Sequence, residues 1–597
     1  MLLWTAWLPL SLLAMPPVDA AQLRAHLDEH VPQQMEESGV PGVVVSVVQG
    51  DRVLLAKGWG QADRERDIPM DGQRTVVRVA SISKTFTATL VAQLEDEGRL
   101  DVDAPVDEYL QGIALPERYD SPATLRHLLS HSSGLINNNV GRVSRQAPTQ
   151  SLADFLTETM PPAVRPPGVA IVYSNHGNAL AGLAVEQVTG VPFAEYAEQA
   201  LLAPLRMESS SFVLGPEIES ALAVSYVPDG DELHPQEYLH FKTVPASALH
   251  TTAADMAHYM IMHLRQGRFE GTQVLSADAV QRMIEPVPAL DPALPTYHYA
   301  FAHVRASGHP TRSHGGSVPA FLSRLVLFDE HEFGVFVCQN SLGKSIGPEI
   351  VESIAEHFLP APTLPKVMPA GDGRPEDPDA VAGHYRRVSK SDTPAFTRGL
   401  ALLLEKASHV TTDADGFLTI DGERFLRTGP GVFQRERDGK APEAVVFVTD
   451  ESGRAQWLHR GLSSAERRAW HASPWVQLPA LAFAWLILLL ATLRRQGLVR
   501  AAAGLALAGV TLPFLYVAWI DAGQVAYLRP LRFGMPGWLE AVRALLPAGA
   551  VLAWIVTGRR PGKGGSRSAA IAVALASTGL IAWFWLWSAP LPGLLRP

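Results

Sequence analysis

The chain has 597 residues, which is too long for one ordinary domain and leaves room for roughly three or four. Its formal net charge of -10 arises mostly from the first part of the chain, so nothing in the charge pattern suggests a nucleic-acid partner. Residues 1–470 are typical of a soluble globular protein, whereas long apolar runs dominate after about Trp475. Cys338 is the only cysteine, and its apolar surroundings predict a buried side chain in a strand.

Residues 1–15 form an apolar run that is too short to span a bilayer. Small residues follow at Val18-Asp19-Ala20, at positions that a signal peptidase reads. We therefore predict a signal peptide at 1–20 that is cut after Ala20. Two alternatives stay open, an uncleaved anchor and a wrongly chosen start codon, because no basic residue precedes the apolar run.

Residues 21–358 alternate between strand and helix patterns. Apolar residues at helical spacing predict a helix over 23–39, and two strands follow at 41–48 and 52–56. Further helices are predicted after residue 80, near 122–131, at 177–190 and at 193–202, and strands return at 322–328 and 333–339. Strands at both ends of a helical middle predict one α+β domain, whose antiparallel sheet is closed by its two termini.

The first chemical motif is Ser81-Ile82-Ser83-Lys84, at the start of a predicted helix. Positions i and i+3 lie on one helix face, so Lys84 is within reach of Ser81. A serine hydroxyl is a poor nucleophile unless a neighbour removes its proton, and a lysine can do so when burial or nearby charge lowers its pKa. The motif also recurs by chance, and a helix N-cap is the plainer role for Ser81 taken alone.

The second motif is Tyr173-Ser174-Asn175. A tyrosine hydroxyl near the same serine and lysine can shuttle protons, as phenol or as phenolate. The Asn175 amide can hold a substrate carbonyl and the lysine together. A turn at a strand edge is the alternative interpretation of this tripeptide.

The third motif is Ser-His-Gly-Gly-Ser at 313–317, just ahead of a predicted strand. Glycines beside a strand let a ligand approach the backbone closely, which places Gly316 in the predicted substrate site. The Ser317 amide can pair with that of Ser81 in an oxyanion hole, and His314 can bind a substrate carboxylate or tune the proton network. A glycine turn between strands is the alternative.

Together and in this order, the three motifs resemble the class C β-lactamase and DD-peptidase family of serine hydrolases, which includes esterases. The second motif has the Tyr-Ser-Asn form of the class C branch, and the third has His-Gly-Gly where related enzymes have Lys-Thr-Gly. Further stretches that look like this family lie at 40–42, 125–135 and 167–168. The resemblance covers about residues 22–358.

The resemblance implies that Ser81 is acylated, that Lys84 takes its proton, that Tyr173 assists both steps and that Asn175 positions the substrate. His314 departs from the family's lysine and is only partly charged near neutral pH. This argues against efficient β-lactamase activity and leaves room for esters and amides without a carboxylate.

We expect neither a cofactor nor a metal. His127 and His131 lie four residues apart on a predicted helix, but no third ligand is evident, so both are interpreted as scaffold.

Six prolines between 358 and 378 predict a linker at 359–379. Short strands and turns then predict a small antiparallel β domain at 380–465, either a barrel or a sandwich. Two roles stay open for this domain: covering the mouth of the active site, or spacing the enzyme from a membrane.

Residues 473–590 contain four apolar runs long enough to cross a membrane, near 475–493, 501–520, 541–557 and 568–588. The gaps after the first and third runs are the most basic, which predicts that they face the cytoplasm. Residues 21–470 would then lie on the extracytoplasmic, periplasmic side of the cytoplasmic membrane. Because the runs carry almost no internal charge, they are interpreted as a transmembrane anchor of four helices rather than as a transporter.

The sequence therefore predicts a membrane-anchored, extracytoplasmic serine hydrolase that works through an acyl-enzyme on Ser81. Its expected partners are the membrane and a peptide or ester substrate, with D-alanine-containing cell-wall components among the candidates. Three alternatives stay open: a β-lactamase, a sensor that is acylated without turnover, and a scaffold that only binds wall polymer.

Overall fold

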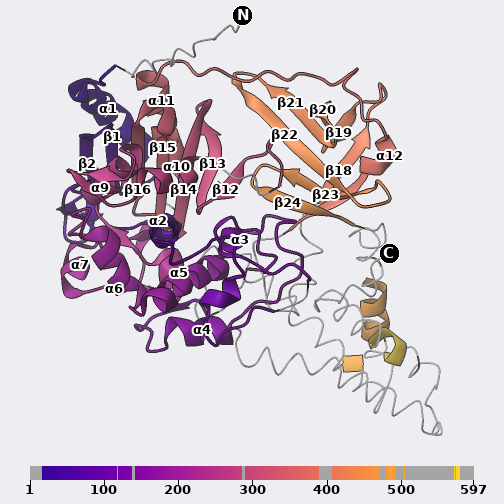
Figure 1. Ribbon diagram of the computed structural model, residues 1–597, viewed down its shortest axis with the longest axis horizontal. Helices are drawn as coiled ribbons and strands as arrows, with labels where there is room; N and C mark the ends of the chain where they lie inside the picture. The colour runs from indigo at the N-terminus through magenta and orange to yellow at the C-terminus, as the bar shows by residue number, and fades with distance from the viewer. Residues whose placement is uncertain are drawn as a thin grey trace, which may run out of the picture.

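The computed structural model shows two folded parts, an α+β domain and a closed β-barrel, which stand side by side in Figure 1. The described residues are 16–116, 119–137, 141–230, 232–285, 290–388 and 407–468, with short helical stretches at 479, 482–490, 503–504, 571 and 573–577. The α+β class predicted for the first part is confirmed.

An eight-stranded antiparallel sheet forms the centre of the α+β domain, with the order β12-β13-β14-β15-β16-β1-β2-β3. The strands are β1 (Gly42–Gln49), β2 (Arg52–Asp63), β3 (Ile68–Pro69), β12 (Thr296–His298), β13 (Phe301–Ala306), β14 (His309–Val318), β15 (Phe321–Phe328) and β16 (Phe333–Gln339). Strand β1 pairs with β16, where Val45 stands opposite Val337, so the two ends of the domain meet within the sheet as predicted. Cys338 in β16 is buried, also as predicted.

Helices cover both faces of this sheet (Figure 1). Side chains of β1 point alternately to two hydrophobic clusters, with Val45 in one and Val44 in the other. On the Val45 side lie α1 (Ala20–Ser38) and α11 (Gly347–Phe358). On the Val44 side lie α2 (Ser83–Asp96), α5 (Asn175–Thr189), α8 (Val244–Ser247) and α9 (Ala253–Leu264).

Shorter elements connect these layers. The helices are α3 (Leu125–Leu129), α4 (Leu152–Glu158), α6 (Phe193–Ala197), α7 (Pro216–Ala221) and α10 (Ala277–Ile284). The paired strands are β4 (Val77–Arg78) with β9 (His250–Thr251), β5 (Val143–Ser144) with β8 (His240–Phe241), β6 (Tyr226–Asp229) with β7 (Glu232–Pro235), and β10 (Arg268–Phe269) with β11 (Thr272–Gln273). The helix predicted near 122–131 is shorter because Thr124, which accepts a hydrogen bond from the His127 amide, starts it there.

Residues predicted to end a signal peptide take part in the fold. The Asp19 carboxylate caps α1 by accepting hydrogen bonds from the amides of Ala21 (2.8 Å) and Gln22 (3.4 Å). The side chain of Val18 is buried in the cluster beneath α1. The predicted cut after Ala20 therefore falls inside α1, while residues 1–15 lie outside the described part of the chain.

The second part of the chain is a closed eight-stranded barrel. Of the two forms predicted for 380–465, a barrel and a sandwich, the structure therefore shows the barrel. Helix α12 (Pro378–Val381) leads into β17 (Gly383–Arg387), β18 (Ala407–Thr412), β19 (Leu418–Ile420), β20 (Glu423–Gly429), β21 (Val432–Arg437), β22 (Lys440–Thr449), β23 (Ala455–Arg460) and β24 (Ser463–Arg468). Tyr385, Phe425, Phe433 and Phe447 are buried together in its core. The barrel is thus a packed body, since side chains fill an interior of this size.

The predicted membrane domain lies largely outside the described residues. The run at 541–557 lies wholly outside them, and the other three runs are described only in short helical pieces. In the part of the chain that is described, no helix combines the length and apolar character needed to cross a bilayer. The four predicted helices therefore have no support from the structure.

Candidate active site

A pocket of about 680 Å³ opens between strands β13–β15 and the helical part of the α+β domain. Every predicted site residue except Lys84 lines it: Ser81, Tyr173, Asn175, His314, Gly316 and Ser317. Lys84 lies directly behind Ser81, in the first turn of α2. Three motifs that are far apart in the sequence therefore meet in one place.

Ser81 lies in a 3₁₀ turn, Ala80–Ile82, that leads into α2. Ala80 has a φ of 53°, a left-handed conformation that alanine adopts only under constraint. Buried Ser83 supplies such a constraint, because its hydroxyl donates to the Ala80 carbonyl at 2.6 Å and accepts from the Leu249 amide at 3.0 Å. The turn leaves Ser81 half-buried at the wall of the pocket.

Strand β14 passes close to this turn at Gly316. A Cβ atom added to Gly316 would lie 2.2 Å from the Val79 carbonyl oxygen and 3.1 Å from the Cβ of Ala80. A larger residue would therefore displace the turn that carries Ser81. The neighbouring Ser317 is exposed and lines the pocket, and its amide stays the predicted partner of the Ser81 amide in an oxyanion hole.

Lys84 is fully buried in α2. Its side-chain nitrogen donates to Ser81 Oγ at 3.0 Å, to Asn175 Oδ1 at 2.8 Å and to the Ala246 carbonyl at 2.7 Å. Burial, with a smaller contribution from the positive charge of Arg142, holds the pKa of Lys84 well below its ordinary value. A lysine in this state can be a neutral amine that accepts the Ser81 proton.

Tyr173 contacts both of these residues. Its hydroxyl shares a hydrogen bond with the Ser81 side chain, and Lys84 Nζ lies 5.0 Å from the centre of its ring. Burial, reinforced by Tyr297, raises the pKa of Tyr173, although the bond with Ser81 opposes the shift. The sequence alone does not decide whether Tyr173 acts as a phenol or as a phenolate, and the raised pKa favours the phenol. Tyr173 is therefore suited to donate a proton and Lys84 to accept one.

Asn175 is the first residue of α5, and the hydroxyl of Ser174 caps that helix by accepting from the Gly177 amide at 3.0 Å. The backbone amide of Asn175 donates to Asn137 Oδ1 at 3.0 Å, a support that sequence reasoning missed. The side-chain oxygen of Asn175 accepts from Lys84, so the predicted link between this amide and the lysine is present.

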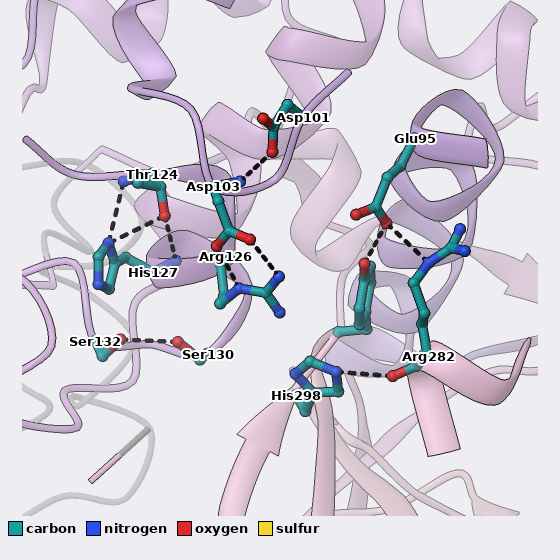
Figure 2. Close-up of polar contacts among 11 residues, drawn as sticks. Glu95, Asp101, Asp103, Thr124, Arg126, His127, Ser130, Ser132, Arg282 and His298 are labelled. Atoms are coloured by element: carbon teal, nitrogen blue, oxygen red, sulfur yellow. Dashed lines mark hydrogen bonds and ion pairs between the residues drawn. The ribbon is translucent and has the colours of Figure 1, made fainter. Parts of the chain in front are cut away.

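His127 and His131 have separate structural roles. His127 Nδ1 accepts a hydrogen bond from the Thr124 amide at 3.2 Å, at the start of α3 (Figure 2). The ring of His131 lies 4.2 Å from that of Tyr173, and His131 Nδ1 accepts from the Ser174 amide at 3.3 Å. Both histidines therefore serve the scaffold, and His131 supports Tyr173. Its sequence position gives no sign of this contact, because the two residues are brought together only by the fold.

His314 is buried in β14, where its Nδ1 donates to the Gly315 carbonyl at 2.7 Å. Arg324 on β15 pairs in register with Gly315 and also lines the pocket. Among the described residues, no carboxylate forms an ion pair with its guanidinium. Burial lowers the pKa of Arg324, but an arginine keeps its charge near neutral pH. A permanent cation therefore lines the pocket together with His314.

Sequence reasoning missed Arg324. The one available signal is a single arginine within the otherwise mostly apolar stretch Phe321–Phe328. The pairing of β15 with β14 shows that this arginine faces the catalytic pocket, and that pairing is not visible in the spacing of the motifs.

This fold and this grouping of a serine, a lysine and a tyrosine are those of a serine hydrolase. The profile of the Beta-lactamase family matches residues 27–356, more than half of the chain, and the chain belongs to that family. The predicted relationship to β-lactamases and penicillin-binding proteins is thus confirmed.

Three curated relatives illustrate how much of the chain such matches cover. Penicillin-binding protein 4 of Amycolatopsis lactamdurans is 27% identical over 380 residues, which cover 61% of this chain and 97% of the relative. Beta-lactamase-like protein 2 of Dictyostelium discoideum is 24% identical over 372 residues, 59% of this chain and 65% of the relative. Esterase EstB of Burkholderia gladioli is 33% identical over 210 residues, 33% of this chain and 53% of the relative. The match spans less than two thirds of the last two relatives.

Solved structures confirm the fold. SurE superposes with a TM-score of 0.54 at 23% identity, over 75% of this chain and 99% of SurE. The octameric penicillin-binding protein homologue from Pyrococcus abyssi superposes with a TM-score of 0.50 at 22% identity, over 75% of this chain and all of that one, a coverage of 100%. Both likenesses cover more of the chain than the family profile does.

The charge of Arg142 predicts how activity depends on pH. Because this charge lowers the pKa of Lys84, we expect Arg142→Gln to raise it. The rising, low-pH limb of kcat/KM should then move to higher pH, and activity near neutral pH should fall. Arg142→Lys keeps the charge and should move the limb less. The measurement is nitrophenyl ester hydrolysis between about pH 5 and about pH 10. An unmoved limb in Arg142→Gln would contradict the coupling.

A second prediction concerns Arg324. Losing a charged hydrogen bond typically costs about 1.5–3 kcal/mol. We therefore expect Arg324→Gln to lower kcat/KM at least about tenfold for a peptide or ester that carries a carboxylate near the scissile bond. A neutral acetyl ester should change by no more than about twofold. Arg305→Gln, which changes an exposed arginine of β13 outside this pocket, is the matched control. Equal losses for both substrates would argue against carboxylate binding.

Proposed function

We propose that this protein is an extracytoplasmic, membrane-anchored serine hydrolase that forms an acyl-enzyme on Ser81 and acts on peptide or ester substrates. The observation that carries the proposal is the 3.0 Å contact between Ser81 Oγ and a buried Lys84 whose pKa is lowered. A serine hydroxyl reacts at neutral pH only beside such a base.

In the first half of the proposed reaction, Ser81 Oγ bonds to the substrate carbonyl carbon and its proton passes to Lys84 Nζ. The carbonyl oxygen becomes an oxyanion, which the amides of Ser81 and Ser317 stabilise. The oxyanion then collapses and the bond to the leaving group breaks. The leaving alcohol or amine takes a proton from Tyr173, and Lys84 returns one to Tyr173.

In the second half, water replaces the leaving group. Its oxygen bonds to the acyl carbon while Lys84 takes its proton. The bond from carbon to Ser81 Oγ breaks, the acid product leaves, and Ser81 recovers its proton from Lys84. The protonated lysine remains bonded to Ser81, Asn175 and Ala246, so neither state of the amine lacks a partner.

The charges in the pocket support substrates that carry a carboxylate. Arg324 and Arg142 line it together with His314. D-alanine-containing peptides fit this requirement, and the relative named Penicillin-binding protein 4 is consistent with them. The relative named Esterase EstB supports ester hydrolysis equally. β-Lactams also carry a carboxylate, so β-lactamase activity is the alternative that Arg324 favours.

Removing the proposed nucleophile tests the reaction. We expect Ser81→Ala to lower hydrolysis of an activated nitrophenyl ester by at least about a thousandfold, because no other group in the site replaces its oxygen. Ser345→Ala, which changes another serine that lines the pocket, is the matched control and should retain activity.

The same variant, compared with wild type, distinguishes a hydrolase from a sensor that is acylated without turnover. Activity that survives in Ser81→Ala would refute the assignment of the nucleophile. A β-lactam adduct on wild-type Ser81 that persists without turnover, seen by intact mass, would support the acylated sensor instead. Rapid turnover would eliminate the sensor.

The membrane anchor rests on the four apolar runs at 473–590 alone. We expect the full chain to sediment with membranes after an alkaline wash, and deletion of 473–597 to release it. External protease should reach the hydrolase domain in spheroplasts. A full chain that stays in the soluble fraction would refute the anchor.

A further inference from the structure

The catalytic pocket has a wall that belongs to the barrel. Leu462 lies in the turn between β23 and β24, and it is half-buried. Among the described residues that line the pocket, it is the one that comes from beyond the α+β domain. Leu462 lies more than a hundred residues of chain after the last catalytic motif, so its contribution arises from docking rather than from the motifs.

One contact fixes this turn against the segment that carries Tyr173. The Ile171 amide donates to Ser464 Oγ at 3.0 Å, and both residues are buried. Ser464 Oγ also hydrogen-bonds to His459 Nδ1 at 2.9 Å, on the preceding strand. Ser464 is two residues after Leu462, and Ile171 is two residues before Tyr173. This hydrogen bond therefore joins the barrel, close to its turn, to the segment that leads into Tyr173.

A second contact lies beside the first. Arg165 and Glu466 form an ion pair at 3.6 Å, with side chains only 8% and 10% exposed. The Arg165 guanidinium also lies 5.6 Å from the ring centre of Trp457 on β23. A buried charge pair is costly to break, because it leaves an uncompensated charge. The pair therefore holds β24 in one position against the α+β domain.

An apolar contact also joins the barrel to the α+β domain. Leu294, ahead of β12, packs with Ala444 and Val446 of β22 in a small cluster of its own. The barrel is thus held against the α+β domain by this cluster as well as by the two polar contacts. Its flanking residues, Gly461 and Ser463, line a second cavity of about 1330 Å³ between the two parts. Leu462 itself lines the catalytic pocket, so the turn borders both spaces.

We propose that Leu462 determines substrate specificity by forming an apolar wall that limits the size of a substrate group next to the scissile bond. This inference rests on the proposed function, because it assigns a boundary to the same pocket. An apolar side chain held in place gains contact with an apolar substrate group that fits and collides with one that is larger. The barrel is then part of the substrate site rather than a spacer.

The test uses the full chain and two series of nitrophenyl and alkyl esters, which differ in the size of the acyl group or of the alcohol. We expect Leu462→Trp to lower kcat/KM for the bulky members of one series at least about tenfold, with the acetyl ester within about twofold of wild type. Leu462→Ala should shift the preference of that series toward bulkier groups. Leu426→Ala, on the far strand β20 and equally half-buried, is the matched control and should leave selectivity unchanged.

Several outcomes would overturn the proposal. They are parallel changes for small and bulky esters, selectivity unchanged in both Leu462 variants, or the same change in Leu426→Ala. The Ser81→Ala variant separates this failure from failure of the proposed function. If wild type hydrolyses the acetyl ester, Ser81→Ala does not, and the Leu462 variants keep wild-type selectivity, only the wall is refuted.

A second measurement tests the same proposal in the case that Ser81 is acylated but the acyl-enzyme does not turn over. Labelling by a small and by a bulky alkyl fluorophosphonate, followed by intact mass, reports size selection at Ser81 in a single step. Slower labelling of Leu462→Trp by the bulky reagent alone would support the wall. Absence of labelling in wild type by both reagents, together with absence of ester hydrolysis, would refute the nucleophile and the wall together.

Discussion

The burial of a lysine beside a serine is the constraint on which the rest of the site depends. A buried ammonium needs three acceptors, and Lys84 has them from three parts of the fold: the 3₁₀ turn that precedes its own helix, α5 and α8. These parts must pack closely for the contacts to form. Gly182 of α5 permits this, because a Cβ atom there would lie 2.2 Å from Pro245 of α8. The packing of the helical layer thus creates the base.

The position of Ser81 is likewise fixed by close packing around it. Ala80 is held in a left-handed conformation, and its carbonyl accepts a hydrogen bond from the Ser83 hydroxyl. Strand β14 packs closely against Ala80 at Gly316. Each of these groups has little freedom, so Ser81 is presented by a rigid turn rather than by a mobile loop. Preorganisation of this kind lowers the cost of reaching the transition state, because few groups need to move during attack.

Local spacing explains which parts were predictable. Ser81 and Lys84 are one helical turn apart, so their contact follows from sequence, and the strands at both ends of the domain follow from their apolar patterns. Arg324, the contact of His131 with Tyr173, and Leu462 were missed because cross-strand register, tertiary packing and barrel docking create them. At the amino terminus, the small residues near Asp19 fit both a cut site and a helix cap, and their spacing alone does not separate the two.

The positive charges of the pocket connect substrate binding to the strength of the base. Burial is the larger cause of the lowered Lys84 pKa, and the charge of Arg142 adds to it. A substrate carboxylate bound near Arg142 and Arg324 would offset that second contribution. The pKa of Lys84 would then rise toward its ordinary value, although burial would still hold it down. The neutral amine would become a stronger base at the moment when Ser81 must give up its proton, while a smaller fraction of Lys84 would be neutral near neutral pH.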